Sequence, residues 1–344
     1  MNSDAPLRSA IQQLARGAPL TAAATAQAFG VIMRGEASPV LTAALLMGLR
    51  ARGETAEEIA GAVTALRRAM VHLDAGDVDG MVDTCGTGGG RVGTLNLSTA
   101  AAFVAAGAGI AVAKHGNRSF TSRSGSADVL EALGVNIMVP PARAVAVLRQ
   151  AGMVFLFAPT YHPAMRHVGP VRKELGVATI MNLLGPLANP AGVRRQVVGV
   201  ADEARGPLMA GALARLGATH ALVLHAAVGM DEISPAGTTR AWEVRDGAVR
   251  EWEITPADHG LACEDLGELA GGEPAQNAAR IEALLAGDGD TAVRCAVLLN
   301  AGAALYVSGN EWSFGEALER ATAALASGAG LRALEKLRAA SAER

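Results

Sequence analysis

The sequence contains little lysine, little cysteine and few aromatic residues. Lysine occurs three times in 344 residues, at Lys114, Lys173 and Lys336, and the other 27 basic residues are arginines. The cysteines also number three, too few and too widely spaced for a disulfide framework or a CxxC metal site. Aromatic residues make up 3% of the chain, whereas glycine occurs 41 times. The small number of cysteines excludes a disulfide-stabilised module. The many glycines allow the backbone to come close to other groups at many positions.

An excess of charge of one sign is also absent, because 30 Lys and Arg residues face 33 Asp and Glu residues and give a net charge of −3. Such a chain is a poor candidate for binding nucleic acid or a membrane surface through bulk charge. The longest run of small apolar residues, 99–113, is shorter than the ~20 residues that span a bilayer. Residues 1–13 lack the apolar segment of a signal peptide. We expect a cytoplasmic protein with no nucleic-acid partner and no membrane contact.

Residues 1–76 carry helical patterns only. Thr21, Ser38 and Thr55 stand where helix N-caps are expected, and Glu58 completes a capping box with Thr55. Apolar residues recur at three- and four-residue spacing in the segments 7–16, 21–34, 40–52 and 55–71. The pattern predicts a small all-helical N-terminal domain, whose apolar faces cover the rest of the chain or pair with another subunit.

From residue 77 to residue 344, short apolar runs alternate with helical patterns. Strands are predicted at 81–83, 110–113, 153–157, 196–199 and 221–225. Helices are predicted at 98–108, 126–133, 142–151, 205–216, 277–286, 292–308 and 314–339. Residues 242–254 indicate a hairpin that turns at 245–247. This alternation predicts a larger α/β domain with a mostly parallel central sheet that helices cover on both faces.

A glycine-rich segment, 83–99, follows the first predicted strand and leads into a helix. Five glycines lie within eight positions, so the backbone can approach a ligand closely and adopt positive φ. Ser98 and Thr99 begin the helix, where free N–H groups and the helix dipole attract an anion. The segment is neither a Walker A loop nor a dinucleotide-binding fingerprint. Glycine content alone leaves two alternatives open, a phosphate or pyrophosphate site and a tight turn without a ligand.

A second polar loop, 113–128, connects a predicted strand to a predicted helix. Lys114, His115, Asn117, Arg118 and several hydroxyl groups fall within thirteen positions. So many donors to an anion, combined with two glycines, favour a polyphosphate site over a solvated basic loop. The presence of one of only three lysines supports that interpretation.

An acidic pair, Asp231 and Glu232, follows the predicted strand 221–225. Mg²⁺ prefers one or two carboxylates together with substrate phosphates and water. In isolation, such a pair is typical of a solvated surface. Beside two loops that attract anions, the metal interpretation is the better one, because anionic groups brought together need a cation.

A fourth polar patch lies at 161–176. Arg172 is suited to a bidentate pair with a carboxylate, which lysine forms less well. His162 is a candidate polar wall of a pocket, whereas His167 is expected on a solvated helix face. Cys85, beside the glycine-rich segment, is expected to be a buried small hydrophobe, because no base accompanies it.

Together and in this order, the motifs resemble the anthranilate phosphoribosyltransferase family over about residues 10–337. The resemblance implies a fold of the nucleoside phosphorylase/phosphoribosyltransferase type, Mg²⁺ as cofactor, and a homodimer joined through the helical domain. It also implies that part of 165–190 packs with that domain. The segments that carry the resemblance are 86–89 with 96–99, 114–118, 124–134, 162–165, 182–190 and the acidic pair.

The resemblance also implies a reaction and its main residues. In the family, the amine of anthranilate displaces pyrophosphate from ribose C1 of phosphoribosyl pyrophosphate, a step of tryptophan biosynthesis. Lys114 and Arg172 are the expected catalytic residues, with Arg172 orienting the anthranilate carboxylate. The expected Mg²⁺ ligands are Ser98, Asp231 and Glu232. Because an arylamine is neutral at physiological pH, we expect positioning and charge stabilisation in place of a strong general base.

Two further sets of contacts follow from the resemblance. Anthranilate is expected to meet Gly86, Asn117, His162 and Arg172. Phosphoribosyl pyrophosphate is expected to contact Gly86, Gly89, Gly90, Thr94, Asn96, Leu97, Ser98, Thr99, Lys114, His115, Gly116, Asn117, Arg118, Ser119, Ser122 and Ser126.

The chain departs from the family pattern in the glycine-rich segment, where Gly90 and Arg91 replace Asp-Gly. We hypothesise that Arg91 partly replaces a second Mg²⁺ at the pyrophosphate. Three alternative functions stay open. A transferase for another aromatic acceptor would keep the loops and change the pocket around Arg172 and His162. A nucleoside phosphorylase would have its own glycine loop, and a non-catalytic nucleic-acid-binding relative would lose that loop and show a basic face.

Overall fold

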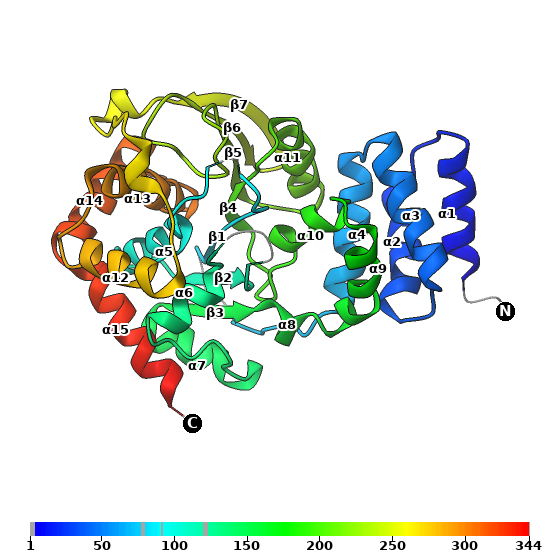
Figure 1. Ribbon diagram of the computed structural model, residues 1–344, viewed down its shortest axis with the longest axis horizontal. Helices are drawn as coiled ribbons and strands as arrows, with labels where there is room; N and C mark the ends of the chain where they lie inside the picture. The colour runs from blue at the N-terminus through cyan, green and yellow to red at the C-terminus, as the bar shows by residue number, and fades with distance from the viewer. Residues whose placement is uncertain (1–3, 77–79, 91, 120–122, 344) are drawn as a thin grey trace.

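A helical part and a larger α/β body lie side by side in the computed structural model, which describes residues 4–76, 80–90, 92–119 and 123–343 (Figure 1). The helical part contains α1 (Ala5–Ala15), α2 (Ala22–Met33), α3 (Pro39–Arg52) and α4 (Ala56–Ala69). These helices match the four predicted segments to within a few residues. The predicted N-caps are confirmed, because the side chains of Thr21, Ser38 and Thr55 accept hydrogen bonds from N–H groups in the first turns of α2, α3 and α4.

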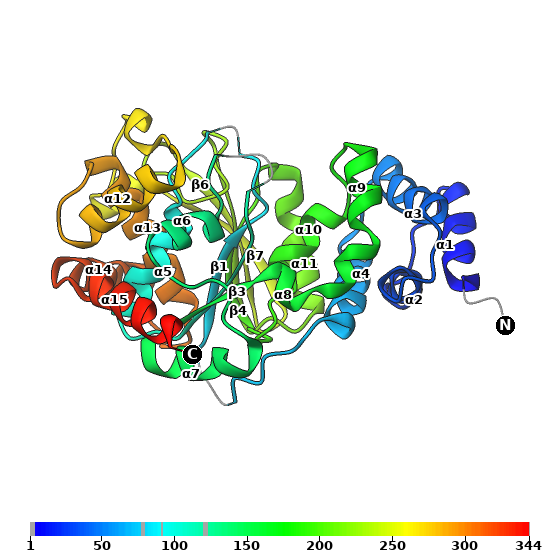
Figure 2. The same ribbon diagram turned by 60° about the horizontal axis from the view of Figure 1, so that its bottom comes forward.

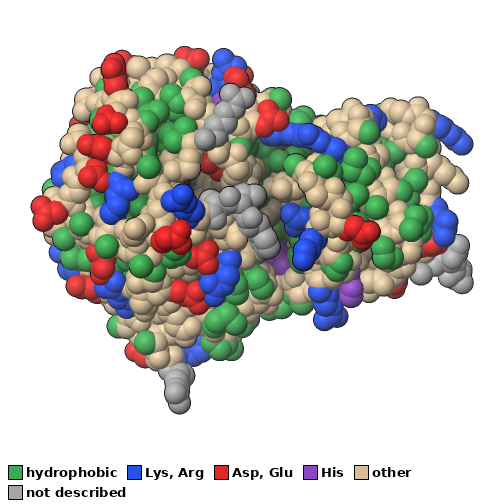
Figure 3. Space-filling view, in the orientation of Figure 1, with side chains coloured by type: hydrophobic (Ala, Val, Ile, Leu, Met, Phe, Trp, Pro, Cys, Tyr) green, Lys and Arg blue, Asp and Glu red, His purple; other side chains and the backbone are tan. Residues whose placement is uncertain are grey.

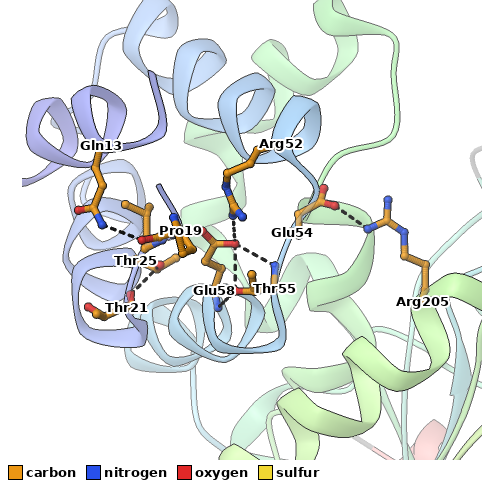
Figure 4. A network of polar contacts seen from close by, with 10 residues as sticks. Gln13, Pro19, Thr21, Thr25, Arg52, Glu54, Thr55, Glu58 and Arg205 are labelled. Atoms are coloured by element: carbon orange, nitrogen blue, oxygen red, sulfur yellow. Dashed lines mark hydrogen bonds and ion pairs between the residues drawn. The ribbon is translucent and has the colours of Figure 1, made fainter. Parts of the chain in front are cut away.

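Glu58 is the polar centre of the helical part. Its carboxylate is fully buried and accepts hydrogen bonds from the backbone N–H groups of Leu20 and Thr55, each at 2.8 Å (Figure 4). It also pairs with the guanidinium group of Arg52. One carboxylate therefore joins the start of α4 to the segment before α2 and to the end of α3.

The α/β body is built on one seven-stranded sheet with the order β3-β2-β1-β4-β5-β6-β7. All neighbours from β3 to β5 are parallel, and β6 and β7 are antiparallel, so the mostly parallel sheet is confirmed. Asp246 and Gly247 have positive φ and form the predicted hairpin turn. The strands are β1 (Val82–Gly86), β2 (Val112–Gly116), β3 (Met153–Phe157), β4 (Arg195–Gly199), β5 (His220–Ala226), β6 (Thr239–Arg245) and β7 (Ala248–Ile254).

Each face of the sheet has its own apolar core. Side chains alternate along a strand, and in β5 Leu222 and Leu224 pack into one core while Ala221 and Val223 pack into the other. Figure 2 shows the resulting layers. The first core is covered by α5 (Leu97–Gly107), α6 (Ser126–Ala132), α7 (Pro141–Ala151), α12 (Pro274–Leu285), α13 (Thr291–Val307), α14 (Phe314–Ala326) and α15 (Ala329–Ala342).

The second core includes the helical part. Buried residues of α1 to α4 form one cluster with those of α9 (Gly169–Leu175), α10 (Met181–Leu187) and α11 (Gly206–Arg215). An ion pair of 2.5 Å between Glu54 and Arg205 also joins the two parts (Figure 4). This packing agrees with the expected association of 165–190 with the helices. The division of the chain into domains at residue 76 stays a prediction.

Three features differ from the predicted elements. The first two strands were predicted to end at residues 83 and 113, but β1 continues to Gly86 and β2 to Gly116, so residues 114–116 of the predicted polar loop belong to a strand. The helix expected over 314–339 is interrupted at Gly328, whose φ of +69° ends α14 and allows α15 to begin in a new direction. Short helices were not predicted, because their few turns give no clear apolar period: α8 (Ala158–Tyr161), α9, α10, η1 (Pro163–His167), η2 (Glu203–Arg205), η3 (Pro256–His259) and η4 (Leu266–Leu269). Among the described residues, no helix has the length and apolar character needed to cross a membrane.

We predict that Glu58→Ala lowers the free energy of unfolding by about 3 kcal/mol, because it leaves buried donors and the Arg52 guanidinium without their acceptor. Urea denaturation followed by circular dichroism measures the change. The matched control is Glu36→Ala, which removes a carboxylate from an exposed ion pair with Arg34 and should leave the midpoint unchanged. An unchanged midpoint for Glu58→Ala would contradict the prediction.

Candidate functional site

The candidate site lies where the loops after β1, β2 and β5 meet at the carboxyl edge of the sheet. The chain leaves β1 toward β2 on one side and returns in β4 on the other, so the strand order reverses between β1 and β4. Ligands of open α/β sheets bind at such a switch point. Figure 3 shows the surface hollowed between the α/β body and the helical part, with Lys and Arg side chains on both sides.

The acidic pair and the glycine-rich segment are in direct contact. The N–H group of Gly88 donates a hydrogen bond of 2.9 Å to Oδ2 of Asp231. A Cβ atom at Gly86 would lie 2.7 Å from the same oxygen, and a Cβ atom at Gly199 would lie 1.5 Å from the carbonyl oxygen of Asp231. Gly86 and Gly199 are partners in the β1–β4 register. Two facing glycines therefore make room for the acidic segment across the strand ends.

Glu232 is held at the start of α5. Its carboxylate accepts hydrogen bonds from Oγ1 of Thr94 at 2.9 Å and from the N–H group of Ser98 at 3.1 Å. Burial, together with the charge of Asp231, raises the pKa of Glu232 to about 8. Burial also raises the pKa of Asp231.

Without a bound cation, it is therefore unfavourable for both carboxylates to be ionised at the same time. A divalent cation between them would remove that penalty, so the pair fits Mg²⁺. Among the described residues, no group of three or more His, Cys, Asp or Glu side chains could hold a metal by itself. A cation on this pair would take its remaining ligands from the nearby Ser98 hydroxyl group, from substrate and from water.

Lys114 is buried at the end of β2, with 1% of its surface exposed. Its Nζ donates to the carbonyl oxygen of Thr84 in β1 and lies 3.3 Å from Oγ of Ser98 at the start of α5. Burial lowers its pKa, and the carboxylates of Asp83 and Glu232 oppose that shift. The ammonium group of Lys114 therefore lies where β1, β2 and α5 meet. Two predicted metal ligands, Ser98 and Glu232, are close to it.

The buried side chains of Asp83 and Asn189 form hydrogen bonds with the backbone of β2. Oδ1 of Asp83 accepts from the N–H group of His115 at 3.2 Å, and Oδ2 accepts from Nδ2 of Asn189 at 2.8 Å. Asn189 also donates to the carbonyl oxygen of Ala113 at 2.7 Å. Burial raises the pKa of Asp83 to about 6, although Lys114 and these donors oppose the shift.

His115 and His162 form a buried pair, with their Nε2 atoms 3.2 Å apart. Nδ1 of His115 lies 3.2 Å from the carbonyl oxygen of Gly185, which only accepts, so Nδ1 carries the proton. Nε2 of His115 then accepts from Nε2 of His162. Burial lowers the pKa of His115 to about 3 and that of His162 to about 4, so both rings are neutral. His162 is thereby connected to His115 in β2, and the contact of both residues with substrate stays a prediction.

The described part of the loop after β2 is bonded mainly to α6. Arg118 forms ion pairs with Asp128 at 2.9 Å and with Glu131 at 2.5 Å. This residue, predicted to bind the substrate phosphate, is therefore already paired with two carboxylates. Asp128 also accepts from the N–H groups of Ser119 and Gly125. Arg118 would have to exchange these partners to bind a phosphate.

The side chain of Asn117 caps its own loop, because Oδ1 accepts from the N–H group of Arg118 at 2.8 Å. Gly116 allows Ser126 to approach, since a Cβ atom there would lie 2.2 Å from Oγ of Ser126. That hydroxyl lies 3.4 Å from the carbonyl oxygen of Asn117. The predicted ligands of this loop are thus close together, and their contact with substrate stays a prediction.

Two predicted contacts of phosphoribosyl pyrophosphate have buried side chains and a third has a bonded amide, whereas the buried hydroxyl of Thr99 has no hydrogen-bond partner among the described residues. The side chains of Leu97 and Thr99 are fully buried, and their N–H groups bond to the carbonyl oxygens of residues 95 and 96. The amide of Asn96 bonds to Ser124 and Asn277. In contrast, Gly86 and Gly89 are exposed and Gly90 is partly exposed. Ser122 and Arg91 lie outside the described residues.

Arg172 lies on α9, which lies beside the helical part (Figure 1). Its side chain is half-buried, and burial lowers its pKa. Within the described part of the chain, no acceptor takes a hydrogen bond from its guanidinium group, which leaves the group available for an external carboxylate. His167 lies on a helix as expected, at the end of η1, but it packs against Gly35 of the helical part and is only partly exposed. Burial raises the pKa of the Cys85 thiol, in keeping with its expected role as a small hydrophobe.

Several residues of the site carry no local signal in the sequence. Gly199 ends a strand like many glycines, Asn189 lies in a loop, and Asn300 lies within a helix. Their importance depends on contacts with residues far away in the sequence, up to 106 positions for Asn189 and Asp83. Of the three, only Asn189 lies inside a segment that the family resemblance singles out.

Comparison with known proteins agrees with this geometry. Residues 78–331 match the model of the glycosyl transferase family a/b domain, and residues 8–70 match that of its helical bundle domain. The chain is 51% identical over 330 residues to anthranilate phosphoribosyltransferase of Rubrobacter xylanophilus, with 96% of each chain covered. It is 48% identical over 335 residues to the enzyme of that name from a Roseiflexus species, covering 96% of this chain and 97% of the relative.

The chain belongs to the anthranilate phosphoribosyltransferase family. Solved structures of the family agree with the fold. The enzyme from Thermus thermophilus superposes with a TM-score of 0.90 at 44% identity, covering 96% of this chain and 98% of that one. The Saccharomyces cerevisiae anthranilate phosphoribosyltransferase in complex with PRPP and Mg superposes with a TM-score of 0.88 at 29% identity, covering 98% of each chain.

We predict that the buried histidine pair makes this family member sensitive to acid. An unfolded histidine binds a proton near pH 6.5, whereas His115 and His162 stay neutral well below that pH. Their contribution to stability is complete above pH 6.5 and decreases as the pH falls toward 4. Between pH 7 and pH 5, the wild type should lose about 2 kcal/mol more free energy of unfolding than His162→Gln.

Urea denaturation at each pH measures this difference. The matched control is His72→Gln, which replaces an exposed histidine and should follow the wild-type curve. Parallel curves for the wild type and His162→Gln would show that the pair has no part in acid sensitivity.

Proposed function

We propose that the protein transfers the phosphoribosyl group of phosphoribosyl pyrophosphate to the amine of anthranilate, giving N-(5-phosphoribosyl)anthranilate and pyrophosphate. The observation that carries the proposal is the meeting of a glycine-rich loop, a buried lysine and an acidic pair at one strand edge. This arrangement suits a pyrophosphate bound with a divalent cation.

In the proposed reaction, the amine nitrogen of anthranilate forms a bond to ribose C1 while the bond from C1 to the pyrophosphate oxygen breaks. The electron pair of that bond leaves with pyrophosphate, and the amine proton is released to solvent. Mg²⁺, when bound by Asp231, Glu232 and Ser98, would neutralise charge on the pyrophosphate. Lys114 supplies a fixed positive charge within 3.3 Å of Ser98 Oγ, where the leaving group would gain charge.

The acceptor is positioned from the other side of the hollow. The Arg172 guanidinium group has no acceptor among the described residues, and we assign to it the carboxylate of anthranilate. His162, held through His115, forms part of the entrance wall. The structure of the S. cerevisiae relative in complex with 4-fluoroanthranilate superposes on this chain with a TM-score of 0.86. This similarity supports an aromatic acid as acceptor.

We further propose that the protein is a cytoplasmic homodimer joined through the helical part, with residues 1–76 and part of 165–190 as one domain. The family resemblance supports this assembly. Val40 and Met47 of α3 are exposed apolar residues, 77% and 36% accessible, on the helical part. Sedimentation of the purified chain would test it.

A fluorescence assay that follows anthranilate consumption with phosphoribosyl pyrophosphate and Mg²⁺ tests the reaction. Turnover of anthranilate supports the proposal. Turnover with another aromatic acid alone would indicate a transferase with a different acceptor, and absence of turnover with tight DNA binding would overturn the proposal.

We predict that Arg172→Ala raises the KM for anthranilate by ~10- to 100-fold, because it removes charge-assisted hydrogen bonds to the carboxylate. The KM for phosphoribosyl pyrophosphate should change by less than about twofold. Lys173→Ala is the matched control, since it removes an exposed charge from the same helix. An unchanged KM for anthranilate would remove Arg172 from the acceptor site.

We predict that Asp231→Asn raises the Mg²⁺ concentration needed for half-maximal activity by ~10-fold or more, because one of two metal-binding carboxylates becomes neutral. EDTA should abolish activity of the wild type, and Mg²⁺ should restore it. Asp288→Asn, which alters an exposed carboxylate between α12 and α13, serves as control. Equal Mg²⁺ dependence of Asp231→Asn and the wild type would contradict the metal assignment.

A further inference from the structure

Asn300 of α13 binds the backbone directly after the acidic pair. Its Oδ1 accepts from the N–H group of Ile233 at 3.0 Å, and its Nδ2 donates to the carbonyl oxygen of Ile233 at 2.9 Å. Nδ2 also donates to the carbonyl oxygen of Ala296 at 2.9 Å, one turn earlier in the same helix. The side chain is buried, with 5% of the residue exposed. One amide therefore contacts both polar groups of Ile233 and is itself held by α13.

Within the described chain, few other hydrogen bonds from distant residues reach the segment that Asn300 holds. Its Met230 and Ile233 side chains pack into the first core, and the N–H group of Ser234 donates to Oγ1 of Thr239 at 3.3 Å. Within the turn, Ala226 donates to Met230 at 3.1 Å and Gly229 donates to Ala226 at 2.8 Å, but these bonds only shape the turn itself. Gly88 reaches Asp231, while Ser98 and Thr94 reach Glu232. These contacts all act on the carboxylates. Asn300 acts on the backbone, and it connects that backbone to a helix in the core.

The position of that connection matters because carboxylates that share a cation need fixed spacing. Ile233 is fully buried and directly follows Glu232. Asn300 also lines the same small pocket as Ser98, Asp231 and Glu232. If the backbone at Ile233 moved, Glu232 would move relative to Ser98, and the two acidic side chains would lose their common orientation toward the strand edge.

We propose that Asn300 is a positioning residue, which fixes the backbone of Ile233 so that Asp231 and Glu232 present their carboxylates to one divalent cation. The inference rests on the proposed function, because the metal role of the acidic pair belongs to that proposal. Supports behind metal ligands commonly change metal affinity by 10- to 100-fold when they are removed. A purely structural role would lower stability without a change in metal affinity.

The test uses Asn300→Ala and, as a milder change, Asn300→Ser, whose hydroxyl is too short to contact both groups of Ile233. Mn²⁺ binding in the presence of phosphoribosyl pyrophosphate is measured directly by electron paramagnetic resonance. Steady-state kinetics give the Mg²⁺ dependence, and hydrogen exchange reports on residues 226–234. Asn136→Ala is the matched control, because Asn136 also binds a backbone carbonyl, that of Ser341, through its amide at 3.1 Å.

We expect the Mn²⁺ dissociation constant and the Mg²⁺ half-saturation to rise by ~10-fold in the Asn300 variants. Exchange at Ile233 should become faster, and kcat should approach the wild-type value at saturating Mg²⁺. Asn136→Ala should bind Mn²⁺ as the wild type does. Wild-type Mn²⁺ affinity in a folded Asn300 variant would overturn the inference.

The controls separate this inference from the proposed function. An inactive wild type would refute the proposed function, and Mn²⁺ binding that Asp231→Asn leaves intact would refute the metal role and the Asn300 inference with it. An active wild type, an impaired Asp231→Asn and an unimpaired Asn300→Ser would refute the role of Asn300 alone.

Discussion

The buried ammonium group of Lys114 connects the three elements on which the site is built. It reaches Thr84 in β1 and Ser98 at the start of α5 from the end of β2. A cation in this place is costly to bury, and the carboxylates of Asp83 and Glu232 compensate for the cost. Those carboxylates in turn depend on Asn189 and on the α5 N-terminus. The charged groups at the carboxyl edge of the sheet are thus connected to one another in the protein without substrate.

Local chemistry made much of the fold predictable. The caps of α2, α3 and α4 and the turn at Asp246 and Gly247 depend on residues a few positions apart. The short helices near the hollow did not show in the sequence. In α10, for example, Pro186 lies inside the helix, and burial against the second core stabilises a segment that propensity disfavours.

The same distinction between local signals and distant contacts applies to the residues of the site. Lys114, Ser98, Asp231 and Glu232 were predicted from residue type and lie together. The contacts of Gly199 and Asn300 with the acidic segment were not predictable, because they depend on strand register and on how α13 packs. Leu97 illustrates the opposite case, since the family motif includes it although its side chain belongs to the first core.

The alternation of side chains along β4 and β5 bears on how the molecule unfolds. Val197 faces one core and Val198 the other, and β5 repeats the pattern. When β4 or β5 leaves the sheet, both cores lose buried side chains, because each of these strands contributes residues to both. The helical part and the α/β body are therefore coupled through shared strands, and they should melt in one cooperative transition.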